Sequence, residues 1–278
     1  MTLNVNTNSA ALSALANLNT TTNNLTTVTG EISSGFAVAD AKDNPAVYTI
    51  AQQQRADIQN LKSVTEGLNR AQSISDVAVS AGGSVSDLLN TLKSDALAAT
   101  DQSLDTTSLD ALNSNFQAIL EQIQQTVSAA SFNGDNLLDG SLTSGLSFMA
   151  NADASSSITL TGMNLALGGT TISVPSNGDI STPTAASQML TLVESSITNV
   201  NAGLAALGAQ SSQVTAHASV VSLLSDSLTT GVGDLVDADV AAESARLTAL
   251  QVQQQLGAQV LSIANQMPQT ILQLFSAH

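Results

Sequence analysis

The residues that could do chemistry in this sequence are few, and Asp237 and Asp239 are the best carboxylate pair among them. Acid–base catalysis needs two carboxyl groups that face one substrate. Residues two apart in a helix point to different sides of it, whereas an acidic side chain just before a helix stabilises the positive end of its dipole. We therefore expect this pair to form a cap or joint between the last two helices.

Two other groups could in principle hold a ligand. His217 and His278 are far apart in the sequence, and neither lies near a cluster of carboxylates; we expect His217 to be a flanking or solvated residue. Asp135, Asn136 and Asp139 supply oxygen atoms of the kind that calcium prefers, but their spacing is irregular and turn dipeptides follow. The sequence thus predicts no catalytic residue, no metal site and no cofactor.

Composition excludes several classes of function. The chain has 278 residues, a net charge of −16 and six basic residues, which argues against nucleic acid because phosphate binding needs clustered Lys or Arg. It has no cysteine, which removes disulfides, thiol catalysis and Cys-ligated zinc. There is no continuous apolar run of 18 residues and no basic leader before an apolar core, so we expect neither membrane insertion nor a cleaved signal peptide.

Both ends of the chain lack charge. Residues 1–30 and 247–278 contain no Asp, Glu, Lys or Arg, yet both have the apolar spacing of helices. An exposed helix normally carries charge, so these helices are predicted to be buried against other copies of the chain and to be stable only where several copies pack together. A membrane-surface helix is the alternative, but it normally carries Lys or Arg on its polar face.

Apolar spacing predicts a mainly α protein, in which long helices form an elongated antiparallel coiled-coil bundle with a small β-hairpin segment. Glycine and proline mark the element boundaries: Gly35 ends the first helix, Asn44 and Pro45 begin the second, and Gly231 and Gly233 end the fourth. Pro268 is expected to bend the last helix or end its regular part. The predicted helices span 5–34, 45–99, 109–127, 184–229 and 238 onward.

Between residues 131 and 181, the dipeptides Asn-Gly and Asp-Gly alternate with short runs of alternating apolar residues, as in β-hairpins. The predicted strands are 146–148, 158–160 and 172–174. The many Ser and Thr residues of 141–182 suit either solvated β structure or O-linked glycans, and the sequence leaves both open.

Two sets of apolar residues carry the predicted contacts. Positions seven apart in the fourth helix are expected to form an intramolecular seam: Val193, Val200, Leu207, Val214, Val221 and Leu228. Apolar positions of the two terminal helices, almost all within the charge-free ends, are expected to form a self-assembly surface: Leu18, Leu25, Ile32, Leu247, Leu250, Leu256, Val260, Ile263, Met267, Ile271 and Leu274.

Several ordered segments resemble bacterial flagellin, the subunit of the flagellar filament. They are VNTNSAALSALANLN at 5–19, ISSG at 32–35, AKDNPA at 41–46, DIQNLKSVTEGLNRAQSISDVA at 57–78, SFNGDNLLDG at 131–140, VDADVAAESARL at 236–247 and SIANQMPQTILQLF at 262–275. Together with the flanking helices, they extend over about two thirds of the chain. Many relatives carry large outer domains in the middle of the chain, for which residues 131–181 leave no room here.

The resemblance implies a structural subunit that polymerises into the filament used for swimming. It implies an inner terminal coiled-coil domain, residues 1–44 with 236–278, which lines the filament channel, and an adjoining helical rod domain, residues 45–235. It also implies type III export to an extracellular flagellum, a homopolymer of subunits, an export chaperone, and junction and cap proteins as partners. The alternatives from other classes are a non-polymerising coiled-coil adaptor of the same organelle and an amphipathic membrane-active protein.

Overall fold

The computed structural model describes residues 7–276, and the side chains of residues 7–267. The chain is mainly α, an antiparallel helical bundle with two small β-hairpins, as the sequence predicts. It divides into two compact units. The terminal unit comprises Met1–Ala56 with Leu228–His278, and the central unit comprises Asp57–Ser227.

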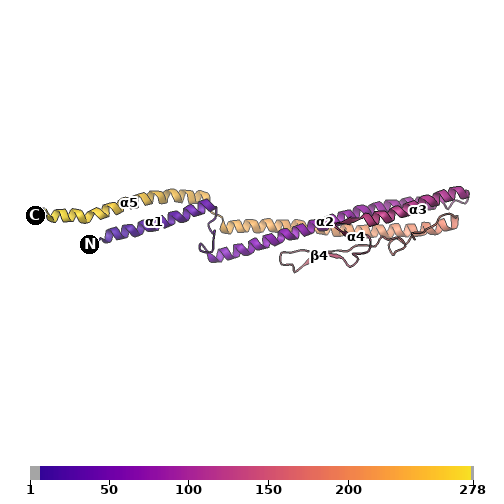
Figure 1. Ribbon diagram of the computed structural model, residues 1–278, viewed down its shortest axis with the longest axis horizontal. Helices are drawn as coiled ribbons and strands as arrows, with labels where there is room; N and C mark the ends of the chain where they lie inside the picture. Colours follow the sequence, from indigo (N-terminus) through magenta and orange to yellow (C-terminus); the bar gives the residue numbers. More distant parts are fainter. Residues whose placement is uncertain (1–6, 277–278) are drawn as a thin grey trace. The chain divides into compact units, whose positions relative to one another are not determined.

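The terminal unit is built on two antiparallel helices, α1 (Ser9–Ser34) and α5 (Val240–Ser276), which lie side by side (Figure 1). Gly35 ends α1 in the left-handed conformation, with φ of 76°, which glycine adopts without a steric cost. Its N–H donates to the carbonyl of Glu31 at 2.8 Å. The predicted break at Gly35 is therefore confirmed.

A short joint follows α1 in the same unit. The N–H groups of Ala37 and Val38 donate to the carbonyl of Val236, at 2.8 and 3.2 Å, and the N–H of Ala238 donates to the carbonyl of Gly35 at 2.9 Å. These bonds tie the end of α1 to the chain between the last two helices. Arg55 lies over the ring of Phe36, 5.7 Å from its centroid.

The central unit contains most of α2 (Pro45–Ala98), α3 (Thr106–Ala129) and most of α4 (Pro183–Val236). α2 and α4 run antiparallel, since Gln72 bonds Ser211 whereas Lys93 pairs with Glu194. Asn115 of α3 donates to Asp95 of α2 at 2.7 Å. The core between the helices is apolar and includes Leu61, Leu68, Ile74, Leu89, Leu92, Phe116, Leu120 and Ile123.

Two antiparallel hairpins follow α3. β1 (Ser131–Phe132) pairs with β2 (Asp135–Asn136), and β3 (Leu146–Met149) pairs with β4 (Ser157–Leu160). The turn of the first hairpin contains Asn133 and Gly134, both with positive φ, which is the conformation that Asn-Gly favours in tight hairpins.

Side chains of α4 hold this segment against the helices. Gln210 accepts from the N–H of Thr161 at 2.7 Å, and the hydroxyl of Ser196, which is fully buried, accepts from the N–H of Ser173 at 3.0 Å.

Two predictions of element bounds are wrong, and one alternative of a third is excluded. α4 continues through Gly231 and Gly233 to Val236, because Val232 and Val236 are buried and their packing outweighs the low helix propensity of glycine. Residues 172–174 do not form a strand; Ile172 makes an isolated bridge with Leu167. Of the two outcomes expected at Pro268, a bend or an end of the regular helix, the end is excluded, since the helical backbone runs on to Ser276.

Candidate self-assembly surface

A heptad seam joins α1 to α5 within one chain. The α1 side chains that turn toward the seam recur at alternating steps of three and four residues: Ala11, Ala14, Leu18, Thr21, Leu25, Val28 and Ile32. The α5 residues that face the seam recur at the same alternating steps: Leu247, Leu250, Gln254, Gly257, Leu261 and Ala264. This is the spacing of a left-handed coiled coil.

Small residues allow the two helices of the seam to approach closely. A Cβ added to Gly257 would lie 3.3 Å from Cδ1 of Leu18. Ala14 and Ala264 are both buried. At the far end, the Asn8 side chain accepts from the N–H of Ala11, as an N-cap, and its amide donates to the carbonyl of Ala264 at 2.7 Å.

A second apolar face of α5 is exposed, and no other segment among the described residues 7–267 covers it. We call it the α5 stripe; it consists of Val252, Leu256, Val260, Ile263 and Met267, which are 51, 54, 55, 62 and 51% exposed. At 100° per residue these five positions fall within an arc of about 80° around the helix. The centre of this arc is about 130° from the centre of the arc of α5 residues that form the seam. Along the helix axis the five residues extend over about 22 Å. α5 thus has two apolar faces: one packs against α1, and the other is exposed.

Two apolar side chains of α1, Leu12 and Leu15, are also exposed, at 59 and 43%. Isolated exposed leucines are common on protein surfaces. A row of five on one helix, without a charged residue among them, is typical of a surface that another protein covers.

The structure divides the predicted self-assembly residues into three groups. Half-buried or buried on the seam are Leu18, Leu25, Ile32, Leu247 and Leu250. Exposed on the α5 stripe are Leu256, Val260, Ile263 and Met267. The side chains of Ile271 and Leu274 lie outside the described residues.

Sequence reasoning missed Val252, Leu12 and Leu15. Val252 stands four residues before Leu256, so continuing the helical spacing backward from Leu256 would have found it.

The seam predicted for α4 lies inside the chain. Val193, Val200 and Val214 are fully buried, and Leu207 and Val221 are 2% exposed. Leu228, at the end of the series, is half-buried. All six side chains therefore turn toward the interior of the unit to which each belongs.

The candidate chemical groups have structural partners. Asp239 caps α5, since its Oδ1 accepts from the N–H groups of Ala241 and Ala242 at 3.0 and 3.1 Å. This confirms the cap expected there. His217 is half-buried, and its Nε2 lies 2.6 Å from the carbonyl oxygen of Ala150 in the β segment. His278 lies outside the described residues.

The loop with the faint calcium pattern uses its oxygen atoms within its own turn. The Asn136 amide donates to the carbonyl of Val127 at 2.7 Å, and its oxygen accepts from the N–H of Leu138 at 2.8 Å. Asp139 accepts from the N–H of Ser141 at 2.8 Å. Among the residues that the structure describes, no three His, Cys, Asp or Glu side chains are grouped so as to hold a metal ion.

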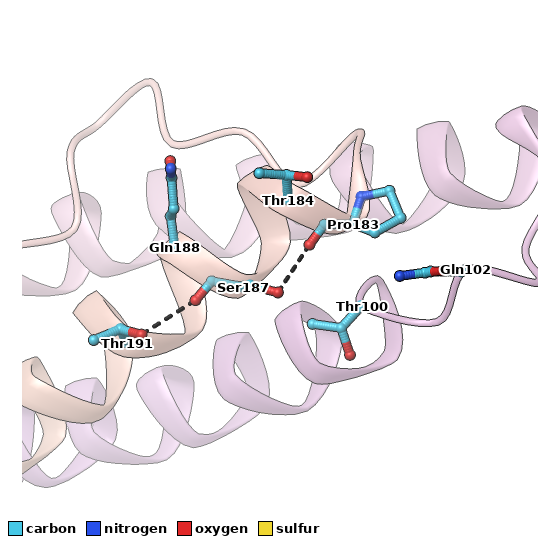
Figure 2. A pocket seen from close by; sticks show the side chains of 7 residues that line it. All are labelled: Thr100, Gln102, Pro183, Thr184, Ser187, Gln188 and Thr191. Carbon is cyan, nitrogen blue, oxygen red and sulfur yellow. Dashed lines mark hydrogen bonds between the residues drawn. The ribbon is translucent and has the colours of Figure 1, made fainter.

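A shallow cleft of about 390 Å³ lies between the start of α4 and the turn that follows α2 (Figure 2). Three of its hydroxyl groups are engaged within their own helices or turns: Ser187 donates to the carbonyl of Pro183 at 2.9 Å, Thr191 to that of Ser187 at 3.2 Å, and Thr100 to that of Leu97 at 2.6 Å. A nucleophilic serine needs an adjacent base, and none lines this cleft. The lining residues are Thr100, Gln102, Pro183, Thr184, Ser187, Gln188 and Thr191.

Comparison with known proteins agrees with the helical termini and the short β segment. Residues 5–143 match the N-terminal helical region of bacterial flagellin, and residues 190–275 match its C-terminal helical region. The chain belongs to the bacterial flagellin family. As a flagellin it is a structural protein, the subunit of a flagellar filament outside the cell.

Individual relatives support this assignment. The chain is 45% identical to flagellin FljM of Caulobacter vibrioides, over 99% of this chain and 100% of the relative. It is 35% identical to a flagellin of Brucella melitensis, over 97 and 98% of the two chains. The full coverage of FljM shows a short flagellin without large outer domains.

A solved structure shares the fold at low identity. It is that of a putative flagellar hook-associated protein from Vibrio parahaemolyticus, which has a TM-score of 0.59, is 10% identical, and covers 70% of this chain and 100% of that one. Of the helices described, none is long and apolar enough to cross a membrane.

Proposed function

We propose that this flagellin polymerises by burying the α5 stripe against neighbouring copies, while the seam between α1 and α5 holds each terminal unit together. The observation that carries the proposal is the pair of apolar faces on α5, of which one is exposed in the part of the chain that the structure describes. The stripe residues are Val252, Leu256, Val260, Ile263 and Met267, together with Leu12 and Leu15 of α1.

The size of the α5 stripe suits a polymer better than a dimer. Completing the burial of five half-exposed aliphatic side chains is worth about 4–8 kcal/mol, at about 1.5–3 kcal/mol for each full burial. Association alone costs about 4–15 kcal/mol of lost translational and rotational freedom. Two stripes buried against each other, worth about 8–16 kcal/mol, leave little beyond this cost, whereas a helical lattice gives each copy several neighbours.

Electrostatics favours the same surface. Each copy carries a net charge of −16, so copies repel one another except where their surfaces lack charge. Residues 247–278 and 1–30 contain no Asp, Glu, Lys or Arg. The ends of the chain are thus where like-charged copies can approach most closely.

The domain assignment and the route to the filament are part of the proposal. Residues 1–44 with 236–278 form the inner domain that lines the channel, and residues 45–235 form the rod; the compact terminal unit supports this division. The subunit is exported without a cleaved signal peptide by a type III route, with a chaperone, and contacts junction and cap proteins. Similarity to flagellins along nearly the whole chain supports these steps.

The adaptor alternative is not favoured, because the matches over the terminal helices and the whole length are to flagellins. The likeness to the hook-associated protein, at 10% identity, shows a shared fold. We propose no catalytic role, since the acid, histidine and hydroxyl groups considered above serve as caps and ties.

Electron microscopy of the purified chain tests the proposal. After addition of precipitant or filament seeds, the full chain should form long filaments. A variant that ends at Arg246, and so lacks residues 247–278, should stay a soluble, partly helical monomer. An adaptor would give no filaments from the full chain, and filaments of normal diameter from the truncated chain would reject the terminal surface.

A further inference from the structure

Two glutamates meet where α1 ends and α5 begins. Glu31 belongs to the last turn of α1, and Glu243 to the first turn of α5, and the negative charge of Glu243 acts on the Glu31 carboxyl. Oε2 of Glu243 is buried and has no hydrogen-bond partner. Two ionised carboxylates have no hydrogen to share, so Glu31 can satisfy this oxygen only when one of the pair is protonated.

The surroundings of the pair do not remove its need for a proton. The positive charge of Arg246 lowers the pKa of Glu31. Its Nη1 lies 3.7 Å from Oε1 of Glu243, whereas the buried oxygen without a partner is Oε2. The Arg246 side chain is 59% exposed, so solvent weakens this ion pair. The negative charge of Asp43, in the loop after α1, raises the pKa of Glu31 slightly further.

We propose that Glu31 and Glu243 share one proton and act as a pH-sensitive latch that holds the end of α1 to the start of α5. When the proton is present, one carboxyl donates to the other and the buried oxygen is satisfied. When it is lost, two negative charges face each other in a site where the Glu243 side chain is only 18% exposed.

The direction of the pH effect follows from the electrostatics. Burial raises the pKa of Glu31 above its ordinary value, the negative charge of Glu243 raises it further, and Arg246 partly lowers it. A carboxyl whose pKa is raised by folding binds its proton more tightly in the folded chain. Its contribution is therefore complete below the ordinary glutamate pKa, about 4.3, and is lost as pH rises through the raised value.

Two carboxylates of the central unit, Asp101 and Asp105, have the opposite trend, which requires a local measurement. Hydrogen bonds from Ser103 and Ser108 lower the pKa values of Asp101 and Asp105, so their contributions are lost as pH falls. A global unfolding curve would mix the two trends. Local amide protection in residues 28–34 and 240–250 reports on the latch alone.

The test uses the full chain as a monomer, so it does not depend on polymerisation. Carbon-13 labelling of the glutamate carboxyls should show that Glu31 titrates above the range of the exposed glutamates of the central unit. Amide protection in residues 240–250, corrected for intrinsic exchange, should fall about twofold or more between pH 5 and pH 8, as expected for a like-charge pair.

A conservative variant separates the latch from simple packing. Glu31→Gln supplies an amide donor at every pH, so its protection at pH 8 should equal or exceed that at pH 5. Glu66→Gln, an exposed glutamate of the central unit, should behave like the natural chain. The proposal is overturned if Glu31 titrates in the range of the exposed glutamates of the central unit, or if Glu31→Gln keeps the natural pH dependence.

Discussion

Replacement of Ile263 by alanine isolates the contribution of the α5 stripe to polymerisation. Ile263 is 62% exposed in the single chain, and complete burial of an isoleucine is worth about 1.5–3 kcal/mol. The part still to be buried in the filament is therefore worth about 1–2 kcal/mol for each subunit. A loss of that size should raise the critical concentration for polymerisation about 5- to 30-fold.

The assay is sedimentation of the polymer at a series of subunit concentrations, with circular dichroism of the monomer measured in parallel. Ile263→Ala should leave the monomer's thermal midpoint unchanged, because the side chain has few intramolecular contacts to lose. Leu250→Ala should do the reverse: Leu250 is 7% exposed on the seam, and such a truncation costs about 2–5 kcal/mol of folding free energy.

Ser262→Ala controls for the alanine itself, since Ser262 is exposed beside the stripe and lies on neither apolar face. It should leave both the critical concentration and the monomer midpoint unchanged. The reasoning is refuted if Ile263→Ala polymerises at the natural critical concentration, or if it lowers the monomer's midpoint as much as Leu250→Ala does.

Three further predictions concern the rest of the chain. Gly82→Ala would place a Cβ 2.4 Å from Cδ2 of Leu204, whereas the Cβ of Gly83→Ala would meet nothing within 4 Å. Urea unfolding should find Gly82→Ala about 1–3 kcal/mol less stable than Gly83→Ala, and equal stabilities would contradict the packing. Gly35→Ala forces alanine into a φ of 76° and should cost about 1–2 kcal/mol in the same assay, so an unchanged midpoint would count against the left-handed cap. Because each subunit carries a charge of −16, light scattering should show faster polymerisation as the Debye length falls from about 30 Å to about 10 Å, and slower growth at higher salt would oppose this account.

Most of the fold could be predicted from the sequence, because turn residues and apolar spacing act locally. Pro45 begins α2 and Gly35 ends α1, and both positions follow from backbone geometry alone. Gly231 and Gly233 were misleading, since the burial of Val232 and Val236 depends on the rest of the terminal unit and is invisible to local propensity.

The self-assembly surface could be predicted only in part. Apolar spacing identified Leu250 and Ile263 alike as positions to be buried, but it could not say what would bury each. The structure separates them, because α1 covers one face of α5 and leaves the other open. Likewise, the pairing of Glu31 with Glu243 depends on the register of two helices that are far apart in the sequence, and no local pattern indicates it.

The difference between the two faces of α5 also suggests how a subunit can exist before it polymerises. The seam buries one apolar face of each terminal helix within the chain, so a single copy does not present both faces to solvent. Only the weaker contacts of the α5 stripe remain to be formed, and they become effective when several neighbours are present together.

Thiol accessibility at Val260 tests the central claim most directly. The chain has no cysteine, so Val260→Cys creates a single reactive thiol on the α5 stripe at a position that is 55% exposed, and Leu250→Cys provides a control that is protected on the seam in every state. A maleimide should react readily with Cys at position 260 in the monomer and much more slowly in the filament. Equal reaction rates in monomer and filament would show that neighbouring copies leave the α5 stripe uncovered.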